Sequence, residues 1–199
     1  MTGSKPLIVG IGGSTRAGST SEVALRIALE HAEKLGAETD LVTGPELALP
    51  FYDPALTSRT AASNRLIDLI RRSDGLLIAT PGYHGTISGM VKNALDYIED
   101  MREDPAPYID GRVVGCIVTA YGAQAIGTTL VALRSVVHAL RGWPTPYAAA
   151  INTAVERMGS GGQAASPAVK AQLELVAQQT MQFIQMRRAW TTANSGDLS

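Results

Sequence analysis

The chain has 199 residues, of which 45% are hydrophobic and 18% are charged, and its net charge is −1. This composition provides enough apolar residues for a packed core, and the lack of basic excess disfavours a nucleic-acid-binding protein. The single cysteine, Cys116, excludes a disulfide framework, and the three histidines lie too far apart in the sequence to indicate a metal site. No apolar run approaches the roughly 18 residues of a membrane span. We expect a cytoplasmic protein with one domain over residues 1–190 and a mobile tail over 191–199.

Short apolar runs alternate along the chain with longer segments of helical periodicity. The runs predict strands over residues 7–11, 38–42, 75–79, 113–119 and 146–151. The periodic segments predict helices over residues 19–36, 61–72, 88–97, 127–141 and around 169–183. Apolar strands that alternate with helices are typical of a parallel sheet covered on both faces. We therefore expect an α/β fold: a three-layer, doubly wound, five-stranded parallel sheet with the flavodoxin-like order 2-1-3-4-5.

The loop after the first predicted strand has the composition of an anion-binding site. Residues 12–21 read Gly-Gly-Ser-Thr-Arg-Ala-Gly-Ser-Thr-Ser and lead into a predicted helix. The first N–H groups of a helix, together with hydroxyl side chains and the Arg16 guanidinium, are suited to binding a phosphate. Ligands of this fold class bind beyond the carboxyl ends of the strands, which is where this loop is expected to lie.

Two alternatives apply to the same loop. Ser19 and Glu22 have the spacing of a capping box, which by itself accounts for that serine. Residues 10–12 begin like a dinucleotide-binding fingerprint, but Thr15 stands where the third glycine belongs. Arg16 favours the phosphate hypothesis, because a connecting loop gains little from an arginine among hydroxyl side chains.

The loops after the third and fourth predicted strands are also rich in glycine. Residues 80–86 read Thr-Pro-Gly-Tyr-His-Gly-Thr, a composition that presents backbone groups and aromatic surface to a flat ligand. The alternative is that His84 is a solvated loop residue and Tyr83 a partly buried anchor. The third loop, 119–127, either closes over the same ligand or is an ordinary connection in which Tyr121 packs locally.

Three further features have structural interpretations. Asn93 has poor helix propensity, so we expect it to bind the backbone of a loop. Lys92 and Asp96 lie four residues apart and are expected to pair across one helical turn. Cys116 lies within an apolar run and is expected to be an inert core thiol.

Two motifs together carry a resemblance to a known family. The pattern Gly-Ser-x-Arg-x-x-Ser-x-(Asn/Ser) matches residues 13–21, and Thr-Pro-x-Tyr-(Asn/His)-Gly matches residues 80–85. A helix with the sequence Lys-Asn-Ala-Leu-Asp follows at residues 92–96. With both motifs at this spacing, nearly the whole chain resembles the NADPH-dependent FMN reductases, flavodoxin-like proteins whose relatives include quinone, azo-dye and chromate reductases. Ser21 departs from the frequent asparagine, and Ser88 from the frequent proline.

The resemblance implies an NAD(P)H-dependent flavin oxidoreductase with FMN as cofactor and NADPH, in preference to NADH, as co-substrate. Hydride would pass to flavin N5, and the electrons would go on to free flavin or a small acceptor. The implied FMN-binding residues, with the phosphate at the first group and the ring at the others, are Ser14, Arg16, Ser19, Thr20 and Ser21; Pro81, Gly82, Tyr83, His84 and Gly85; and Tyr121 and Gly122. No catalytic side chain and no metal are implied.

The resemblance also implies a homodimer or a dimer of dimers, and it allows a flavin-dependent monooxygenase as the recipient of reduced FMN. Three alternative functions stay open. The first is a quinone, azo or chromate reductase that uses the same site. The second is a flavodoxin-like electron carrier, which the near-neutral charge disfavours. The third is an interaction module that keeps the fold without a flavin.

Overall fold

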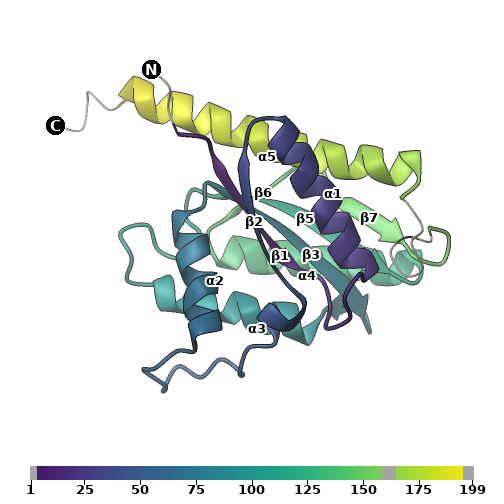
Figure 1. Cartoon of the computed structure of the whole chain (residues 1–199), viewed down its shortest axis with the longest axis horizontal. Coiled ribbons are helices and arrows are strands. Elements are labelled where there is room, and N and C mark those ends of the chain that lie inside the picture. The colour runs from purple at the N-terminus through teal and green to yellow at the C-terminus, as the bar shows by residue number, and fades with distance from the viewer. Residues whose placement is uncertain (1–3, 157, 159–164, 195–199) are drawn as a thin grey trace.

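The computed structural model of the chain describes residues 4–156, 158 and 165–194. Strands and helices alternate from one end of the chain to the other (Figure 1). The strands are β1 (Leu7–Gly12), β2 (Glu38–Thr43), β3 (Gly75–Tyr83), β4 (Thr86–Ile87), β5 (Val113–Ala120), β6 (Trp143–Pro144) and β7 (Ala149–Asn152). The helices are α1 (Thr20–Lys34), α2 (Ala61–Arg72), α3 (Gly89–Asp96), α4 (Ala123–Ala139) and α5 (Pro167–Asn194), with short 3-10 turns η1 (Gly44–Leu47) and η2 (Tyr97–Met101).

The strands form one sheet with the order β2-β1-β3-β5-β6, and the pairs along this path are parallel. The expected α/β class with a parallel sheet is therefore confirmed. The expected detail of five strands in the order 2-1-3-4-5 is wrong, because the sheet has seven strands. β4 is an addition that pairs with the end of β3, and β7 pairs with β5.

The last predicted strand, residues 146–151, is replaced by two short strands. β6 pairs with the beginning of β5 at Val113 and Val114, and β7 pairs with its end. The N–H groups of Trp143 and Thr145 donate to carbonyls where β5 begins, whereas the N–H of Tyr147 donates to Gln179 Oε1 of α5 over 2.9 Å, so pairing with β5 is interrupted between β6 and β7.

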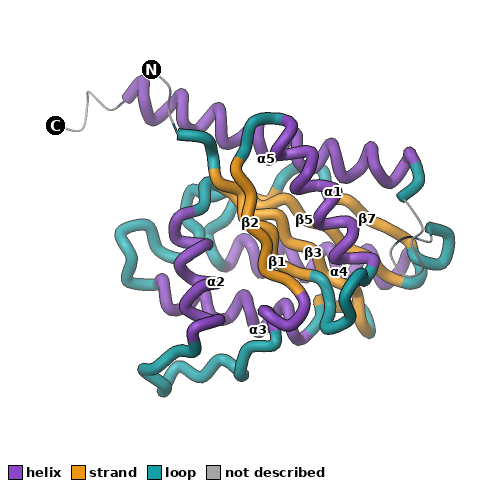
Figure 2. Tube along the Cα trace, in the orientation of Figure 1, coloured by secondary structure: helices purple, strands orange, loops and turns teal. Residues whose placement is uncertain are grey.

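Helices cover both faces of the sheet, giving the three layers that the sequence predicts (Figures 1 and 2). Successive side chains of β1 point to opposite faces. Ile8 packs in a buried cluster with α1 and α5, whereas Val9 and Ile11 pack in a second cluster with α2, α3 and α4. Burial on both faces is what makes the strand apolar at every position, in place of the alternation of a half-exposed strand.

Two helix ends differ from the expected positions. α4 begins at Ala123 and not at residue 127, because Gly122, with φ +105°, makes the turn from strand to helix there. α5 runs to Asn194, so residues 191–194 are helical where we expected the tail to begin. Residues 195–199 lie outside the described part of the chain.

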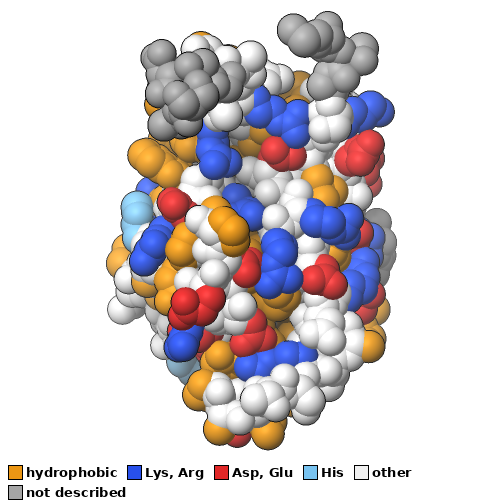
Figure 3. Space-filling view, turned by 90° about the vertical axis from the view of Figure 1, so that its left-hand side faces the viewer, with side chains coloured by type: hydrophobic (Ala, Val, Ile, Leu, Met, Phe, Trp, Pro, Cys, Tyr) orange, Lys and Arg blue, Asp and Glu red, His pale blue; other side chains and the backbone are white. Residues whose placement is uncertain are grey.

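Positive and negative side chains are interspersed over the face drawn in Figure 3, without a large area of one sign. Exposed ion pairs such as Arg65–Asp40 and Arg71–Asp104, each 2.8 Å long, are consistent with this mixture. None of the helices in the described residues has the length and apolar character needed to cross a bilayer.

Candidate functional site

Three loops meet at the carboxyl end of the sheet, where β1, β3 and β5 lie side by side. They border a cleft of about 480 Å³. Its lining combines hydroxyl groups, one arginine and aromatic rings, and consists of Ser14, Thr15, Arg16, Ser19, Thr20, Ser21, Pro81, Gly82, Tyr83, Thr119, Ala120, Tyr121 and Thr153. The structure thus gathers predicted residues from all three loops in one place.

Three predicted residues lie outside this cleft. His84, Gly85 and Gly122 line a neighbouring hollow of about 460 Å³, and Tyr121 borders both spaces. Of the ring-binding residues predicted in the second loop, Pro81, Gly82 and Tyr83 therefore line the cleft. His84 and Gly85 form the turn that follows this segment.

Glycine is required where the first loop leaves β1. The N–H of Gly13 donates to the carbonyl of Ala79 over 3.1 Å, which holds the start of the loop against the end of β3. A Cβ atom at Gly12 would lie 1.9 Å from the same carbonyl oxygen, and its φ of +144° is unfavourable for other residues. This close approach places the first loop directly beside the second.

The loop then caps the helix that follows it. Ser19 is the N-cap of α1, and its Oγ accepts the N–H of Glu22 over 3.3 Å. The Glu22 carboxylate in turn accepts the N–H of Gly18 over 3.1 Å. The capping-box alternative is confirmed for Ser19, with the glutamate reaching the residue before the serine. Because the serine also lines the cleft, capping and ligand binding are compatible.

The hydroxyl groups of the loop have different degrees of freedom. Ser14 Oγ accepts the N–H of Arg16 over 3.2 Å, and the buried Ser19 and Ser21 hydroxyls lie 3.4 Å apart on the cleft floor. Thr20 lines the cleft, but its hydroxyl donates to the carbonyl of Met158 over 3.0 Å. Thr20 is therefore available to a ligand only as an acceptor, which is unsuited to an ionised phosphate.

Among the described residues that line the cleft, Arg16 is the one with a charged side chain. It is exposed, and its guanidinium has no hydrogen bond or ion pair within the described residues. The nearby Glu22 does not compete for it, because Glu22 Oε1 accepts two bonds from Arg26, over 2.8 and 3.0 Å. The cleft therefore offers one positive charge, several hydroxyl donors and the beginning of α1, a donor set that fits a phosphate.

The second loop, predicted as a glycine-rich loop, is a β-hairpin. Tyr83 pairs with Thr86, and the two residues between them, His84 and Gly85, have φ values of +51° and +85°. Two central residues with positive φ define the type I′ turn that suits the twist of a hairpin. Histidine tolerates this region better than most residues, so the His-Gly pair is explained as turn chemistry.

The hairpin also determines which backbone groups face the cleft. Tyr83 and Thr86 form the hydrogen-bonded pair next to the turn, so the next pair, Gly82 and Ile87, is not hydrogen-bonded. The N–H and C=O of Gly82 therefore point away from β4. A side chain at Gly82 is excluded from the other direction, because a Cβ would lie 2.6 Å from Thr129 Oγ1 of α4. On that side β5 pairs with β3 as far as Pro81 and Thr119, so the hairpin offers the cleft a flat edge without a side chain at Gly82.

The third loop is held by a residue that the sequence did not indicate. Asn152, at the end of β7, accepts the N–H of Gly122 on its Oδ1 over 3.0 Å. Thr153 lines the cleft, and its N–H donates to the carbonyl of Ala120 over 2.9 Å. Asparagine after a predicted strand is too common to have singled out Asn152 in advance.

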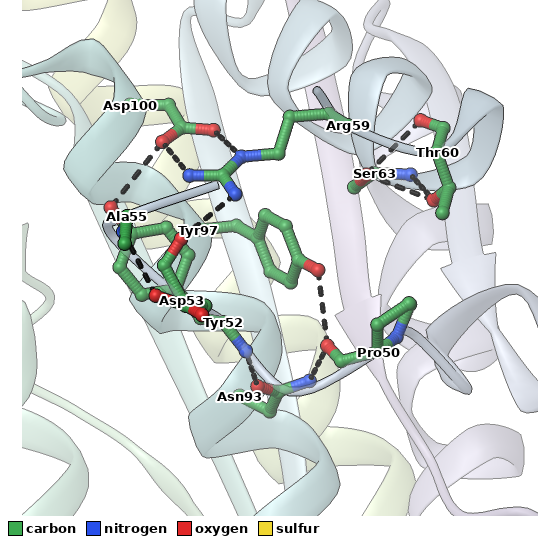
Figure 4. Close-up of polar contacts among 10 residues, drawn as sticks. All are labelled: Pro50, Tyr52, Asp53, Ala55, Arg59, Thr60, Ser63, Asn93, Tyr97 and Asp100. Carbon is green, nitrogen blue, oxygen red and sulfur yellow. Dashed lines mark hydrogen bonds and ion pairs between the residues drawn. The ribbon is translucent and has the colours of Figure 1, made fainter. Parts of the chain in front are cut away.

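The structural expectations for residues outside the cleft are confirmed. Asn93 Oδ1 accepts the N–H of Tyr52 over 2.8 Å, and Asn93 Nδ2 donates to the carbonyl of Pro50 over 2.9 Å (Figure 4). Lys92 and Asp96 form the expected ion pair. Cys116 is buried, and burial raises the pKa of its thiol to about 12, so it is inert at neutral pH. In the described ranges, no cluster of three metal-ligating side chains occurs.

The chain is similar in sequence to a known family and to several characterised proteins. The profile of the family described as NADPH-dependent FMN reductase matches residues 6–156. An NAD(P)H-dependent FMN reductase of Pseudomonas aeruginosa is 30% identical over 115 residues, which are 58% of this chain and 62% of that protein. An FMN-dependent NADPH-azoreductase of Staphylococcus aureus is 27% identical over 139 residues, 67% of this chain and 70% of that protein.

Solved structures show the same fold. The flavoenzyme NAD(P)H:(acceptor) oxidoreductase FerB of Paracoccus denitrificans superimposes with a TM-score of 0.69 at 22% identity, over 92% of this chain and 98% of that one. This chain spans less than two thirds of the length of the Pseudomonas relative. The family profile, however, covers most of the chain and includes both motifs, residues 13–21 and 80–85. The chain therefore belongs to the NADPH-dependent FMN reductase family.

Proposed function

We propose that the protein is an NAD(P)H-dependent flavin oxidoreductase that binds FMN in the cleft between β1, β3 and β5. The observation that carries this proposal is the pairing of two unlike surfaces in one cleft. One end carries hydroxyls and Arg16, which has no side-chain partner among the described residues, and the other is the flat edge of the hairpin at Pro81–Tyr83. A phosphate attached to a flat ring fits this pair better than an inorganic anion or an apolar ligand does.

The phosphate end is assigned to the first loop. Arg16 provides a charge-assisted hydrogen bond, and Ser14, Ser19 and Ser21 provide hydroxyl groups. The start of α1 adds its partial positive charge beside them. Each of these groups is already held by the loop, so binding a phosphate orders little more than the arginine side chain.

The ring end is assigned to the hairpin and the third loop. Gly82 gives the cleft a flat edge without a side chain, and Tyr83 and Tyr121 supply aromatic surface at the rim. FMN bound there would supply the two-electron redox chemistry, whereas the protein provides binding, orientation and electrostatics. The rim is open, since more than half of each tyrosine side chain is exposed. A nicotinamide ring therefore has room to stack on the outer face of a bound flavin.

The electron acceptor is proposed to be free flavin or another small molecule. A second candidate is an acceptor of the quinone or azo-dye type, and the open rim favours it because a flat aromatic molecule fits where the nicotinamide does. NADPH as the preferred co-substrate, transfer of reduced FMN to a monooxygenase, and assembly as a homodimer or dimer of dimers stay predictions. Light scattering on the purified protein tests the assembly.

The decisive experiment is a fluorescence titration of the apo-protein with FMN and, as the matched control, with riboflavin, which lacks the phosphate. We expect FMN to bind at least about tenfold more tightly, because the phosphate adds charge-assisted hydrogen bonds. The FMN-loaded protein is then mixed with NADPH in a stopped-flow instrument without oxygen. Loss of the visible absorbance of oxidised flavin is the expected result.

Each other outcome selects an alternative. Equal affinities for FMN and riboflavin would show that the first loop does not bind the phosphate. FMN binding without reduction by NADPH or NADH would indicate an electron carrier. Failure to bind either flavin would leave an interaction module without a cofactor. Turnover with free FMN, a quinone and an azo dye then ranks the acceptors.

A further inference from the structure

The wall of the cleft that carries Tyr121 is held from outside its own loop. Tyr121 is 82% exposed, so packing of its side chain contributes little to its position. Its backbone neighbours are instead bound to the segment after β7. The carbonyl of Ala120 accepts the N–H of Thr153 over 2.9 Å, and the N–H of Gly122 donates to Asn152 Oδ1 over 3.0 Å.

Asn152 provides the side-chain half of this attachment. Its Oδ1 also accepts the N–H of Ala154 over 3.0 Å, which closes a local turn after β7. Both partners are backbone donors, so the oxygen and nitrogen of the amide are assigned without ambiguity. The bond to Gly122 crosses 30 residues of sequence, and a local turn has no need of it.

The attachment acts at the point where the loop has the most freedom. Gly122 is the N-cap of α4, has φ +105°, and its side-chain position offers no capping group. A glycine between an exposed tyrosine and a helix permits many orientations of that tyrosine. The hydrogen bond that the Gly122 N–H donates to Asn152 removes much of that freedom.

We propose that Asn152 is a positioning residue that fixes Tyr121 as one wall of the flavin cleft. The proposal rests on the function proposed above for its effect on flavin, whereas the anchoring of the loop is a property of the protein alone. Asn152 acts through Gly122 and Tyr121. Its removal therefore weakens the ring end of the site and leaves the phosphate end intact.

The first test follows the loop without flavin. Hydrogen–deuterium exchange of the apo-protein should be faster over residues 120–124 in Asn152→Ala, because the Gly122 N–H loses its acceptor. Asn152→Asp keeps the acceptor oxygens and should exchange like the wild type. Unchanged exchange in Asn152→Ala would overturn the proposal, whatever the protein binds. Urea unfolding of both variants shows whether the fold is retained.

The second test measures where the effect is felt in the site. Asn152→Ala should weaken FMN and riboflavin equally, by roughly 3- to 10-fold, the value expected for one neutral hydrogen bond. Asn152→Asp should restore riboflavin affinity, since that ligand carries no phosphate charge. An effect on FMN alone would place Asn152 at the phosphate and contradict the proposal.

A double-mutant cycle shows whether the effect passes through the tyrosine. In a Tyr121→Ala background, Asn152→Ala should change riboflavin affinity less than about twofold, because the group that it positions is gone. A full, additive effect in that background would overturn the proposed route. If the wild type binds no flavin but its loop is loosened by Asn152→Ala, the proposed function fails and the anchoring of Tyr121 stands.

Discussion

Two arginine-bearing loops follow neighbouring strands of the sheet, and they use the same side chain in opposite ways. The loop after β1 carries Arg16, whose guanidinium has no partner within the described residues. The loop between η1 and α2 carries Arg59, whose guanidinium is surrounded by partners (Figure 4). The partners of an arginine, more than its presence in a loop, distinguish a binding group from a structural one.

Arg59 holds its own loop against η2. It forms a two-pronged bond with the Asp100 carboxylate, over 2.7 and 2.8 Å, and donates to the carbonyl of Asp53 over 3.0 Å. The guanidinium also lies 4.8 Å from the centre of the Tyr52 ring. The bond to Arg59 lowers the pKa of Asp100. We call this cluster of Tyr52, Asp53, Arg59 and Asp100 the loop clamp.

The largest expected effect comes from breaking the loop clamp. Arg59→Ala leaves Asp100 partly buried without its partner, and we expect a loss of about 2 to 3 kcal/mol in the free energy of unfolding. This value lies between those of buried and exposed pairs, because the side chains of Arg59 and Asp100 are 14% and 24% exposed. Urea unfolding of the apo-protein measures it.

Arg102→Ala is the matched control. Arg102 also forms ion pairs with acidic neighbours, Glu99 and Glu103, but its side chain is 59% exposed. We expect a change below about 0.5 kcal/mol. Equal losses in both variants would show that the geometry of the clamp adds nothing to an ordinary surface pair. FMN affinity of the folded Arg59→Ala protein should stay close to that of the wild type.

The opposite pattern is expected for Arg16. Arg16→Ala should weaken FMN binding by about 1.5 to 3 kcal/mol, or roughly ten- to a hundredfold, because one charge-assisted hydrogen bond is lost. The stability of the apo-protein should not change, since the side chain has no partner to lose in the part of the chain that the structure describes. Fluorescence titration and urea unfolding of the same preparation measure the two quantities.

Arg16→Lys sharpens this prediction. Lysine keeps the charge but not the planar fork of donors, so its FMN affinity should lie between those of wild type and Arg16→Ala. Riboflavin affinity should be the same in all three proteins. A variant that loses riboflavin as well would assign Arg16 to the ring, or to the shape of the loop.

Acid should weaken the loop clamp before it affects the loop that carries Arg16. The pKa of Asp100 is lower in the folded protein than in the unfolded chain, where it is about 3.9. The stability from this shift is therefore present above the unfolded pKa and lost as pH falls through the folded pKa. The difference in unfolding free energy between wild type and Asp100→Asn should shrink below about pH 4. A constant difference from pH 7 to pH 3 would contradict this account.

The sequence predicted the fold class because the buried strands are short and apolar at every position. It did not predict the division of the last strand, since the N–H of Tyr147 is diverted to Gln179, a partner 32 residues away that only the fold brings near. The sequence also did not predict β4, because residues 80–86 have the composition of a loop. Positive φ at His84 and Gly85 turns that segment into a hairpin, and His-Gly is a less familiar signal for such a turn than Asn-Gly.

For the site, the sequence was informative where local composition carries the chemistry. The hydroxyl-rich loop around Arg16 was recognisable, because anion binding needs those groups close together in the chain. Asn152 and the loop clamp were not recognisable as parts of a network. The bond between Gly122 and Asn152 spans 30 residues and that between Arg59 and Asp100 spans 41, and only the fold brings these partners together. Asn93 was an intermediate case, since its poor helix propensity indicated a bond but not the partner.

The smallest expected effect comes from a substitution of His84, in the turn of the β3–β4 hairpin. In the structure this residue serves the turn: its φ is +51°, and its side chain borders the neighbouring hollow outside the flavin cleft. His84→Asn keeps a residue that tolerates the left-handed region, so stability should change by less than about 0.5 kcal/mol. FMN affinity and the pH profile of NADPH oxidation should be those of wild type. His84→Val, a β-branched residue in that region, should cost about 1 to 2 kcal/mol and weaken flavin binding by displacing Tyr83. If His84→Asn instead removed one limb of the pH profile while binding stayed normal, the histidine would be a proton donor. It would then act on a ligand in addition to forming the turn.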